Sequence, residues 1–129
     1  MIIDTSAVVA ILRAEPEADD FRRLIEASRT VAMSAGSVLE LAMVIGRSDP
    51  ELVDQFLDEL QIAVLPVDAE HVRWARHAFQ KFGRGSDSAA HLNYGDCLAY
   101  AAAKATGESL LHKGEDFGHT DIAAAFTGS

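Results

Sequence analysis

Short runs of β-branched and other apolar residues alternate with longer amphipathic segments along the whole chain. The short runs predict strands, and the segments whose apolar residues recur at helical spacing predict helices. Strands are expected at residues 1–4, 30–33, 62–67 and 108–112, with a short fifth strand at 121–124. Helices are expected at residues 7–13, from 16 through 25, and at 34–46, 50–60, 68–82 and about 94–106.

Several of the expected helices carry capping residues at their ends. Ser34 and Asp68 are predicted N-caps, because a short polar side chain there accepts a hydrogen bond from the first turn. Gly107 is predicted to stop the last helix, since glycine tolerates the left-handed conformation of a C-terminal cap. In the helix that follows Asp68, one apolar face is shared by Val72, Ala75, Phe79 and Phe82.

This alternation predicts an α/β fold, with a short parallel sheet of about four to five strands flanked by helices on both faces. A chain of 129 residues suits one domain, and neither a repeat nor a linker divides it. A single domain over residues 1–129 is therefore expected. In such sheets, ligands bind beyond the carboxyl ends of the strands, so functional side chains are expected at that edge.

A content of 49% hydrophobic and 24% charged residues is typical of a globular protein. The apolar stretches are too short to span a membrane and no basic leader precedes one, so a soluble, cytoplasmic protein is expected. Cys97 is the single cysteine, which excludes an internal disulfide and a thiolate cluster. It is expected to be a small core residue.

Certain acidic residues each stand alone among apolar or small neighbours. They are Asp4, Glu40, Asp96 and Asp116. Burying a carboxylate is costly unless a partner compensates its charge. Asp4 and Asp116 follow predicted strands and therefore lie at the binding edge of the sheet. Glu40 within one helix and Asp96 at the start of another can reach the same crevice. Converging carboxylates repel each other, so the sequence predicts a site for a hard divalent cation.

Each of these acids also has a structural explanation. Asp96 can complement a helix N-terminus that Asn93 caps, and Glu40 can close a capping box with Ser37. The two aspartates that follow strands can simply form turns. A structural role for all of them at once is the weaker explanation, because those two aspartates independently lie at the binding edge.

The formal net charge of −9 argues against a broad basic surface for nucleic acid. Two divalent cations would change this charge from −9 to −5, so a nucleic acid would be held locally by metal and a few basic residues. Lys81 and Arg84 flank a glycine-rich connection and could touch phosphates, although an exposed loop is the simpler explanation. Trp74 is either an interface anchor or ordinary packing.

Parts of the sequence resemble PIN-domain ribonucleases, and most closely the VapC toxins of bacterial toxin–antitoxin pairs. The resemblance covers essentially the whole chain in the family's order and spacing. The segments of this chain that carry the resemblance are Asp4-Thr5-Ser6-Ala7, Glu40 in its apolar helix, Asn93-Tyr94-Gly95-Asp96-Cys97 and residues 110–121. The segment Lys113-Gly114-Glu115-Asp116-Phe117, combined with the other parts, is the specific signal.

The resemblance implies an acidic cluster, and this chain has an acid at each of its positions. They are Asp4, Glu40, Asp96 and Asp116. It implies that the hydroxyl of Thr5 or Ser6 orients the first aspartate or a metal-bound water. Asp121 matches a further acidic position near the site. His112 is a mild departure, since an aromatic residue is commoner there, and it leaves the acids untouched.

The resemblance also implies partners. RNA is the implied substrate, a small VapB-type antitoxin is the implied inhibitor, and the chain is expected to form a homodimer. With the antitoxin, a heterotetramer or a larger complex is expected. Single-stranded or looped RNA is the expected target, because a duplex conceals its bases.

The expected reaction is hydrolysis of RNA phosphodiester bonds by a Mg²⁺-dependent endoribonuclease, with Mn²⁺ as a substitute. Asp4 and Asp96 are the first choice as direct ligands, while Glu40 and Asp116 bind a second ion or act through water. Two alternatives stay open. One is a haloacid-dehalogenase-like phosphatase, which requires a second aspartate two residues after the first. This chain has Ser6 at that position, which weakens this alternative. An acidic pocket could also bind a basic partner peptide without nuclease activity.

Overall fold

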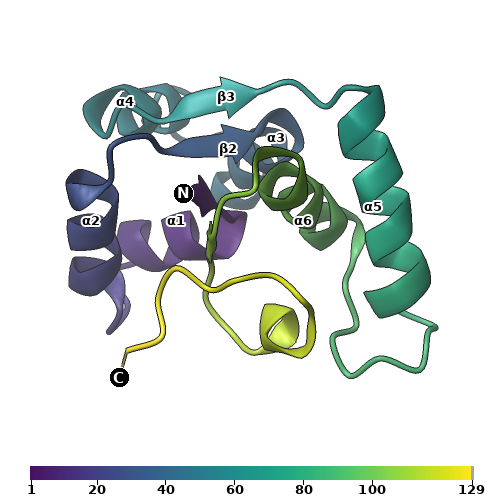
Figure 1. The fold of residues 1–129 in the computed structure, drawn as a ribbon. Coiled ribbons are helices and arrows are strands. Elements are labelled where there is room, and N and C mark those ends of the chain that lie inside the picture. The colour runs from purple at the N-terminus through teal and green to yellow at the C-terminus, as the bar shows by residue number, and fades with distance from the viewer. Residues whose placement is uncertain (129) are drawn as a thin grey trace.

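The structure is a computed structural model that describes residues 1–128. Within these residues, four parallel strands form one sheet in the order β3-β2-β1-β4 (Figure 1). They are β1 (Ile2–Ile3), β2 (Ala32–Ser34), β3 (Ala63–Leu65) and β4 (Leu110–Leu111). The predicted parallel α/β sheet is confirmed, with strands shorter than the sequence pattern indicated.

The expected fifth strand at 121–124 is reduced, within the described residues, to a single bridge between Ala124 and Leu110. The Leu110 amide donates to the carbonyl of Ala123, and the Ala125 amide donates to the carbonyl of Leu110, both at 2.9 Å. The C-terminal segment therefore runs beside the edge strand β4 without becoming a strand itself.

Helices connect the strands. They are α1 (Thr5–Leu12), α2 (Ala18–Ala27), α3 (Ala35–Ile45), α4 (Leu52–Glu59), α5 (Ala69–Phe82) and α6 (Tyr94–Thr106), with the 3₁₀ helix η1 (Asp116–His119) after β4. Ser34 and Asp68 cap α3 and α5 as predicted, and Gly107 ends α6 with a left-handed φ of 71°. Within the described residues, none of these helices has the length and apolar character needed to cross a membrane.

The first turns of three helices differ from the prediction. α1 begins at Thr5 rather than Ala7, because the Asp4 side chain caps it through a hydrogen bond from Ser6 N. α2 and α4 each begin two residues after the proline that was expected in the first turn. Each proline therefore lies in the turn that precedes its helix.

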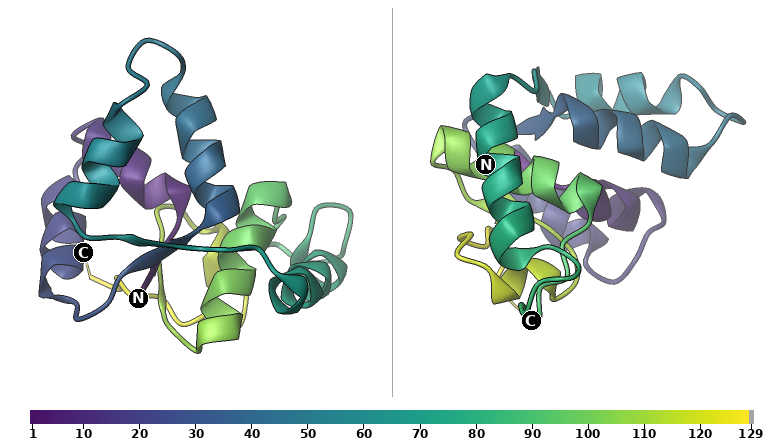
Figure 2. Two further views of the ribbon diagram at one scale, coloured as in Figure 1. Left: turned by 90° about the horizontal axis from the view of Figure 1, so that it is seen from above. Right: turned by 90° about the vertical axis from the view of Figure 1, so that its right-hand side faces the viewer.

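The sheet has a hydrophobic core on each face. Ile3 and Leu111 belong to a core built with α1, α2, α3 and α4, while Ile2 and Leu110 belong to a core built with α5 and α6. This division follows from the alternation of side chains along a strand. Figure 2 shows α5 and α6 together, away from α1 and α4. Helices on both faces are thus confirmed, and Cys97 is a buried core residue as expected.

Only part of the predicted apolar stripe of α5 is packed: Phe82 is in the core and Ala75 packs against it. His71, Ala78 and Phe82 are buried, whereas Val72 is 44% exposed and Phe79 is 55% exposed. A helical repeat defines a face within one helix, but the neighbouring helix decides which part of that face is covered. Here α6 covers only one side of the stripe, and the other side lines a groove.

Candidate active site

Asp4 follows β1 and caps α1 with a buried carboxylate. The residue is 4% exposed, and its Oδ2 accepts hydrogen bonds from Ser6 N at 3.0 Å and from Ser6 Oγ at 2.5 Å. Burial raises the pKa of Asp4 to about 6; the bonds from Ser6 oppose this rise, and the charges of Asp96 and Glu40 add to it. Asp4 is thus a buried acid whose negative charge its protein neighbours only partly offset.

Asp96 lies in the first turn of α6 and forms a capping box with Asn93. Its Oδ2 accepts from Asn93 N at 3.0 Å, and Asn93 Oδ1 accepts from Asp96 N at 2.8 Å. Burial raises the pKa of Asp96, the bond from Asn93 lowers it, Asp116 and Glu40 raise it, and Arg84 lowers it. The capping role considered from sequence is confirmed for Asp96, and it holds this carboxylate in one orientation.

Glu40 extends from α3 toward the start of α6, where its carboxylate lies against Gly95. A Cβ added to Gly95 would overlap the Glu40 carboxylate in its present position, so the absence of a side chain at Gly95 lets the carboxylate lie there. The capping box between Glu40 and Ser37, which the sequence offered as an alternative explanation for Glu40, does not form. Ser34 caps the helix instead, and Ser37 Oγ is buried with no hydrogen-bond partner in the described part of the chain.

Asp4, Glu40 and Asp96 line one hollow of about 350 Å³, called here the acidic hollow. Its other lining residues are Thr5, Ser6, Val9, Glu15, Val44 and Lys113. Asp116 is exposed at the start of η1 and lies outside this lining, yet it is near enough to raise the pKa of Asp96. The fold therefore gathers three of the predicted acids around one space and places the fourth nearby.

The hydroxyls of Ser6 and Thr5 have different partners. Ser6 Oγ donates to Asp4 and accepts from the backbone amide of Lys113 at 3.0 Å, so it connects the first aspartate to the loop after β4. Thr5 Oγ1 donates to the carbonyl of Ser37 at 3.0 Å and thereby ties α1 to α3. Of the two hydroxyls, Ser6 is the one that orients the aspartate.

Asp121 does not line the acidic hollow. Its carboxylate accepts a hydrogen bond from the Tyr100 hydroxyl at 2.9 Å and pairs with Lys104 Nζ at 2.7 Å. Burial by itself raises the pKa of Asp121, but the contacts with Lys104 and Tyr100 together outweigh it, so the pKa lies below its usual value. Asp121 therefore fastens the C-terminal segment to α6, whereas the resemblance placed it near the site.

Lys113 and Arg84 are basic residues near the acids. Lys113 lines the acidic hollow, and its Nζ lies 2.9 Å from Glu15 and 3.4 Å from Glu17. The sequence showed Lys113 in a family-like segment but offered no signal for its partners, which lie about a hundred positions earlier. His112, the departure from the family pattern, packs its ring 5.1 Å from that of Phe117, as an aromatic residue would.

The acidic hollow offers the donor chemistry of a hard divalent cation, because its carboxylates are oxygen ligands and its lining contains neither cysteine nor histidine. The hydrogen bonds to Asp4 and Asp96 found among residues 1–128 end on Oδ2, which leaves both Oδ1 atoms for a ligand. The expected convergence is incomplete, however. Within the described residues, no group of three His, Cys, Asp or Glu side chains is already placed to hold an ion. Mutual repulsion keeps carboxylates apart unless a cation lies between them.

The fold is thus a small parallel α/β sheet with helices on both faces and an acidic hollow lined by residues that follow β1 and begin α6. The family model of the PIN domain matches residues 1–123, and the chain belongs to this family. Its relatives within the family are VapC ribonucleases. The chain is 47% identical to ribonuclease VapC42 of Mycobacterium tuberculosis, over 98% of this chain and 100% of that protein. It is 44% identical to ribonuclease VapC30 of the same organism, over 95% and 96% of the two chains.

A solved structure shows the same fold. The crystal structure of Mycobacterium tuberculosis VapC20, a sarcin–ricin loop cleaving toxin, superposes with a TM-score of 0.74. The match covers 95% of each chain at 16% sequence identity. The family resemblance read from the sequence is thus confirmed, and the phosphatase alternative is excluded by membership of the PIN-domain family.

Proposed function

We propose that the chain is a divalent-metal-dependent endoribonuclease that hydrolyses RNA at the acidic hollow. The observation that carries this proposal is a buried aspartate, Asp4, whose pKa rises to about 6 in a hollow shared with Glu40 and Asp96. Burying a carboxylate close to other carboxylates lowers the free energy of unfolding. Such a cluster is therefore expected where its negative charge serves binding or catalysis. Identity of 47% to ribonuclease VapC42 supports RNA as the substrate.

Mg²⁺ is the proposed cofactor, with Mn²⁺ as a substitute, because both are hard ions that prefer oxygen ligands. Asp4 and Asp96 would hold it directly, and Glu40 and Asp116 would bind a second ion or act through water. A bound divalent ion supplies an activated water and offsets negative charge on the reacting phosphate. Ser6 keeps the Asp4 carboxylate in place through its two hydrogen bonds, and the capping box does the same for Asp96.

Cleavage of a single-stranded RNA by the purified chain tests this proposal. Activity is expected with Mg²⁺ or Mn²⁺ and not with EDTA. Asp4→Asn and Asp96→Asn are each expected to lower kcat about a hundredfold or more, while Asp58→Asn, an exposed aspartate on α4, is the matched control. Full activity of either site variant in Mg²⁺ would contradict the assignment.

A binding module for a basic peptide is the second candidate function. The observation in its favour is Lys113, an amine-bearing side chain that already lines the acidic hollow. A lysine or arginine from a partner could occupy the same space, and an inhibitor could use that contact on an active enzyme. Absence of Mn²⁺ binding in calorimetry, together with absence of RNA cleavage, would favour the module without enzymatic activity.

We also propose a VapB-type antitoxin as partner and a homodimer as the active assembly, in a heterotetramer or larger complex in the cytoplasm. Apolar side chains left open on α3 support a protein contact there: Leu39 is 63% exposed, Met43 74% and Val44 45%. Co-expression with a small basic-tailed protein from the neighbouring reading frame tests the partner. A stable complex that suppresses RNA cleavage is expected, and light scattering reports its mass.

A further inference from the structure

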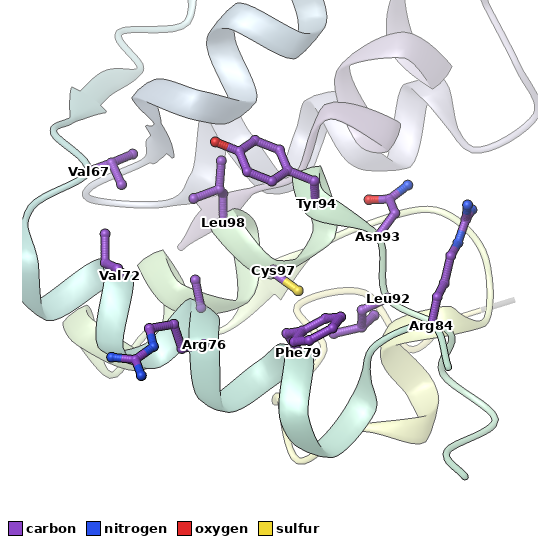
Figure 3. A pocket seen from close by; sticks show the side chains of 11 residues that line it. Val67, Val72, Arg76, Phe79, Arg84, Leu92, Asn93, Tyr94, Cys97 and Leu98 are labelled. Carbon is purple, nitrogen blue, oxygen red and sulfur yellow. The ribbon is translucent and has the colours of Figure 1, made fainter. Parts of the chain in front are cut away.

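A groove lies beside the acidic hollow, between α5 and the first turns of α6 (Figure 3). It is called here the α5–α6 groove, and its volume is about 600 Å³. The two spaces are linked through Asn93, which lines the groove and whose backbone amide donates at 3.0 Å to Oδ2 of Asp96, a residue that lines the acidic hollow. A ligand at the Asn93 end of the groove therefore lies near Asp96.

Apolar side chains form the floor and the sides of this groove, and several of them are open to solvent. Tyr94 is 84% exposed, Phe79 is 55% exposed and Val72 is 44% exposed. In Figure 3, the rings of Tyr94 and Phe79 stand on different sides of the groove around Cys97. Exposed aromatic rings that flank an apolar floor offer faces on which a planar ligand can stack.

The groove carries positive charge on a chain that is strongly acidic. Arg76 and Arg84 line it, its lining contains no acidic residue, and neither arginine forms an ion pair within residues 1–128. Arg84 is also near enough to Asp96 to lower the pKa of that carboxyl. Figure 3 shows its side chain at the same end of the groove as Asn93. Guanidinium groups pair well with phosphates, and both arginines are free to do so.

We propose that the α5–α6 groove binds a nucleotide of single-stranded RNA that neighbours the cleaved bond, with its base against Tyr94 and Phe79 and its phosphate on Arg84. This inference rests on the proposed function, because the acidic hollow must hold the cleaved phosphodiester. The apolar walls accept a base that a duplex would conceal. The unpaired arginines complement the charge of an RNA backbone, which gives the strand a local path across an acidic protein.

Steady-state cleavage of a fluorescein-labelled single-stranded RNA by the full chain in Mg²⁺ tests the groove. Tyr94→Ala, Phe79→Ala and Arg84→Gln are each expected to raise KM about tenfold, with a smaller effect on kcat, because stacking and phosphate contacts bind the strand. Tyr94→Phe, which keeps the ring, is expected to stay close to the wild type. The controls are Arg73→Gln, an exposed arginine on α5 outside the groove, and Val64→Ala on β3.

Fluorescence anisotropy with the same RNA in an Asp4→Asn background measures binding without cleavage. The Kd is expected to rise about tenfold for Tyr94→Ala and not for the controls. Unchanged KM and Kd in all groove variants would overturn the groove assignment while leaving the ribonuclease proposal intact. Absence of cleavage by the wild type would contradict the ribonuclease proposal, and anisotropy would still report on the groove.

The groove could instead be covered by a second copy of the chain, and light scattering distinguishes this case. The groove variants are expected to keep the mass of the wild type. If Tyr94→Ala or Phe79→Ala lowers the mass and leaves the RNA affinity of each subunit unchanged, the groove is an interface between copies. That result would overturn the nucleotide assignment.

Discussion

Asp4 carries most of the electrostatic cost of the site at the scale of single residues. Its carboxylate is buried after β1, and the hydrogen bonds from Ser6 offset only part of the desolvation. A buried carboxylate without a full counter-charge binds its proton more tightly than an exposed one. The same residue is thus a source of instability in the metal-free protein and a ligand for a cation.

Asp4→Asn is expected to abolish cleavage and to stabilise the metal-free protein above pH 6. The folded protein holds the Asp4 proton up to a pKa of about 6, whereas the unfolded chain releases it near 3.8, so the free energy of unfolding falls as the pH rises between these values. The difference between these two pKa values corresponds to about 3 kcal/mol, which is the upper limit of the gain in the free energy of unfolding for Asp4→Asn. The variant keeps the helix cap, because asparagine is also a good N-cap. Urea unfolding at pH 4 and pH 8 measures the gain in stability. Equal stability of wild type and variant at pH 8 would contradict the burial argument.

Asp96 serves both as a cap and as a proposed ligand, and two substitutions separate these roles. Asp96→Asn keeps an oxygen that can accept from Asn93 N, so stability is expected to change little while cleavage is lost. Asp96→Ala removes the bond from Asn93 N and leaves only the Asn93 half of the capping box, so it is expected to cost about 1 kcal/mol more. Thermal unfolding and cleavage assays on both variants measure the difference. Activity in Asp96→Asn would limit this residue to capping.

Gly95→Ala is expected to lower cleavage strongly without destabilising the fold. The added methyl group would displace the Glu40 carboxylate, which ends a flexible side chain, and alanine favours a helix over glycine by about 0.5–1 kcal/mol. The matched control is Gly118→Ala, where an added Cβ meets nothing within 4 Å. Normal cleavage by Gly95→Ala would show that Glu40 is dispensable.

At the scale of elements, Ser6 joins two segments that are distant in sequence. Its hydroxyl connects the β1–α1 junction to the loop after β4 through Asp4 and the Lys113 amide. The acidic hollow thus depends on a contact between the two neighbouring strands β1 and β4 at their carboxyl ends. A hydroxyl that both donates and accepts is needed at this position.

Ser6→Ala is expected to lower cleavage about tenfold and to raise the pKa of Asp4 further, because the bond that favours its charged form is lost. Stability is expected to fall by about 1 kcal/mol. Ser28→Ala is the control, since it removes a hydroxyl bond to the Leu24 carbonyl at the end of α2. The pH dependence of kcat, which should move to higher pH in Ser6→Ala alone, checks the assignment.

At the scale of the whole molecule, negative charge is the property that metal binding would change most. The chain has a formal charge of −9. Several of its acids line the acidic hollow, whereas Arg76 and Arg84 line the neighbouring groove. Neither arginine forms an ion pair among residues 1–128. A cation in the hollow would relieve repulsion among Asp4, Glu40 and Asp96. Folding, metal binding and RNA binding are therefore expected to depend on one another.

Mg²⁺ is expected to raise the melting temperature of the wild type by several degrees. A ligand at a hundred times its Kd stabilises the folded state by about 2.7 kcal/mol. The effect is expected to be small in Asp4→Asn and Asp96→Asn, which lose a ligand charge. Scanning calorimetry in Mg²⁺, with NaCl at equal ionic strength as control, measures it. Equal shifts in wild type and variants would place the stabilising ion elsewhere.

Local sequence patterns were sufficient for much of the architecture. Short β-branched runs and helical repeats predicted the α/β alternation, and the caps at Ser34, Asp68 and Gly107 were confirmed, because hydrogen bonds within one turn determine them. Isolated acids after strands indicated the edge at which Asp4 lies, since parallel strands end together. The family membership was also readable from these blocks.

Contacts between distant segments were decided by the tertiary structure alone. Asp121 pairs with Lys104 and does not line the acidic hollow. Ser6 accepts a hydrogen bond from the Lys113 amide, 107 positions away. Phe79 stays exposed because α6 covers only part of the apolar face of α5. The physical reason is that a repeat or a cap reports only on neighbours within a few residues. The partner that a face or a polar group finally meets depends on how the helices and strands pack together, and no short stretch of sequence contains that information.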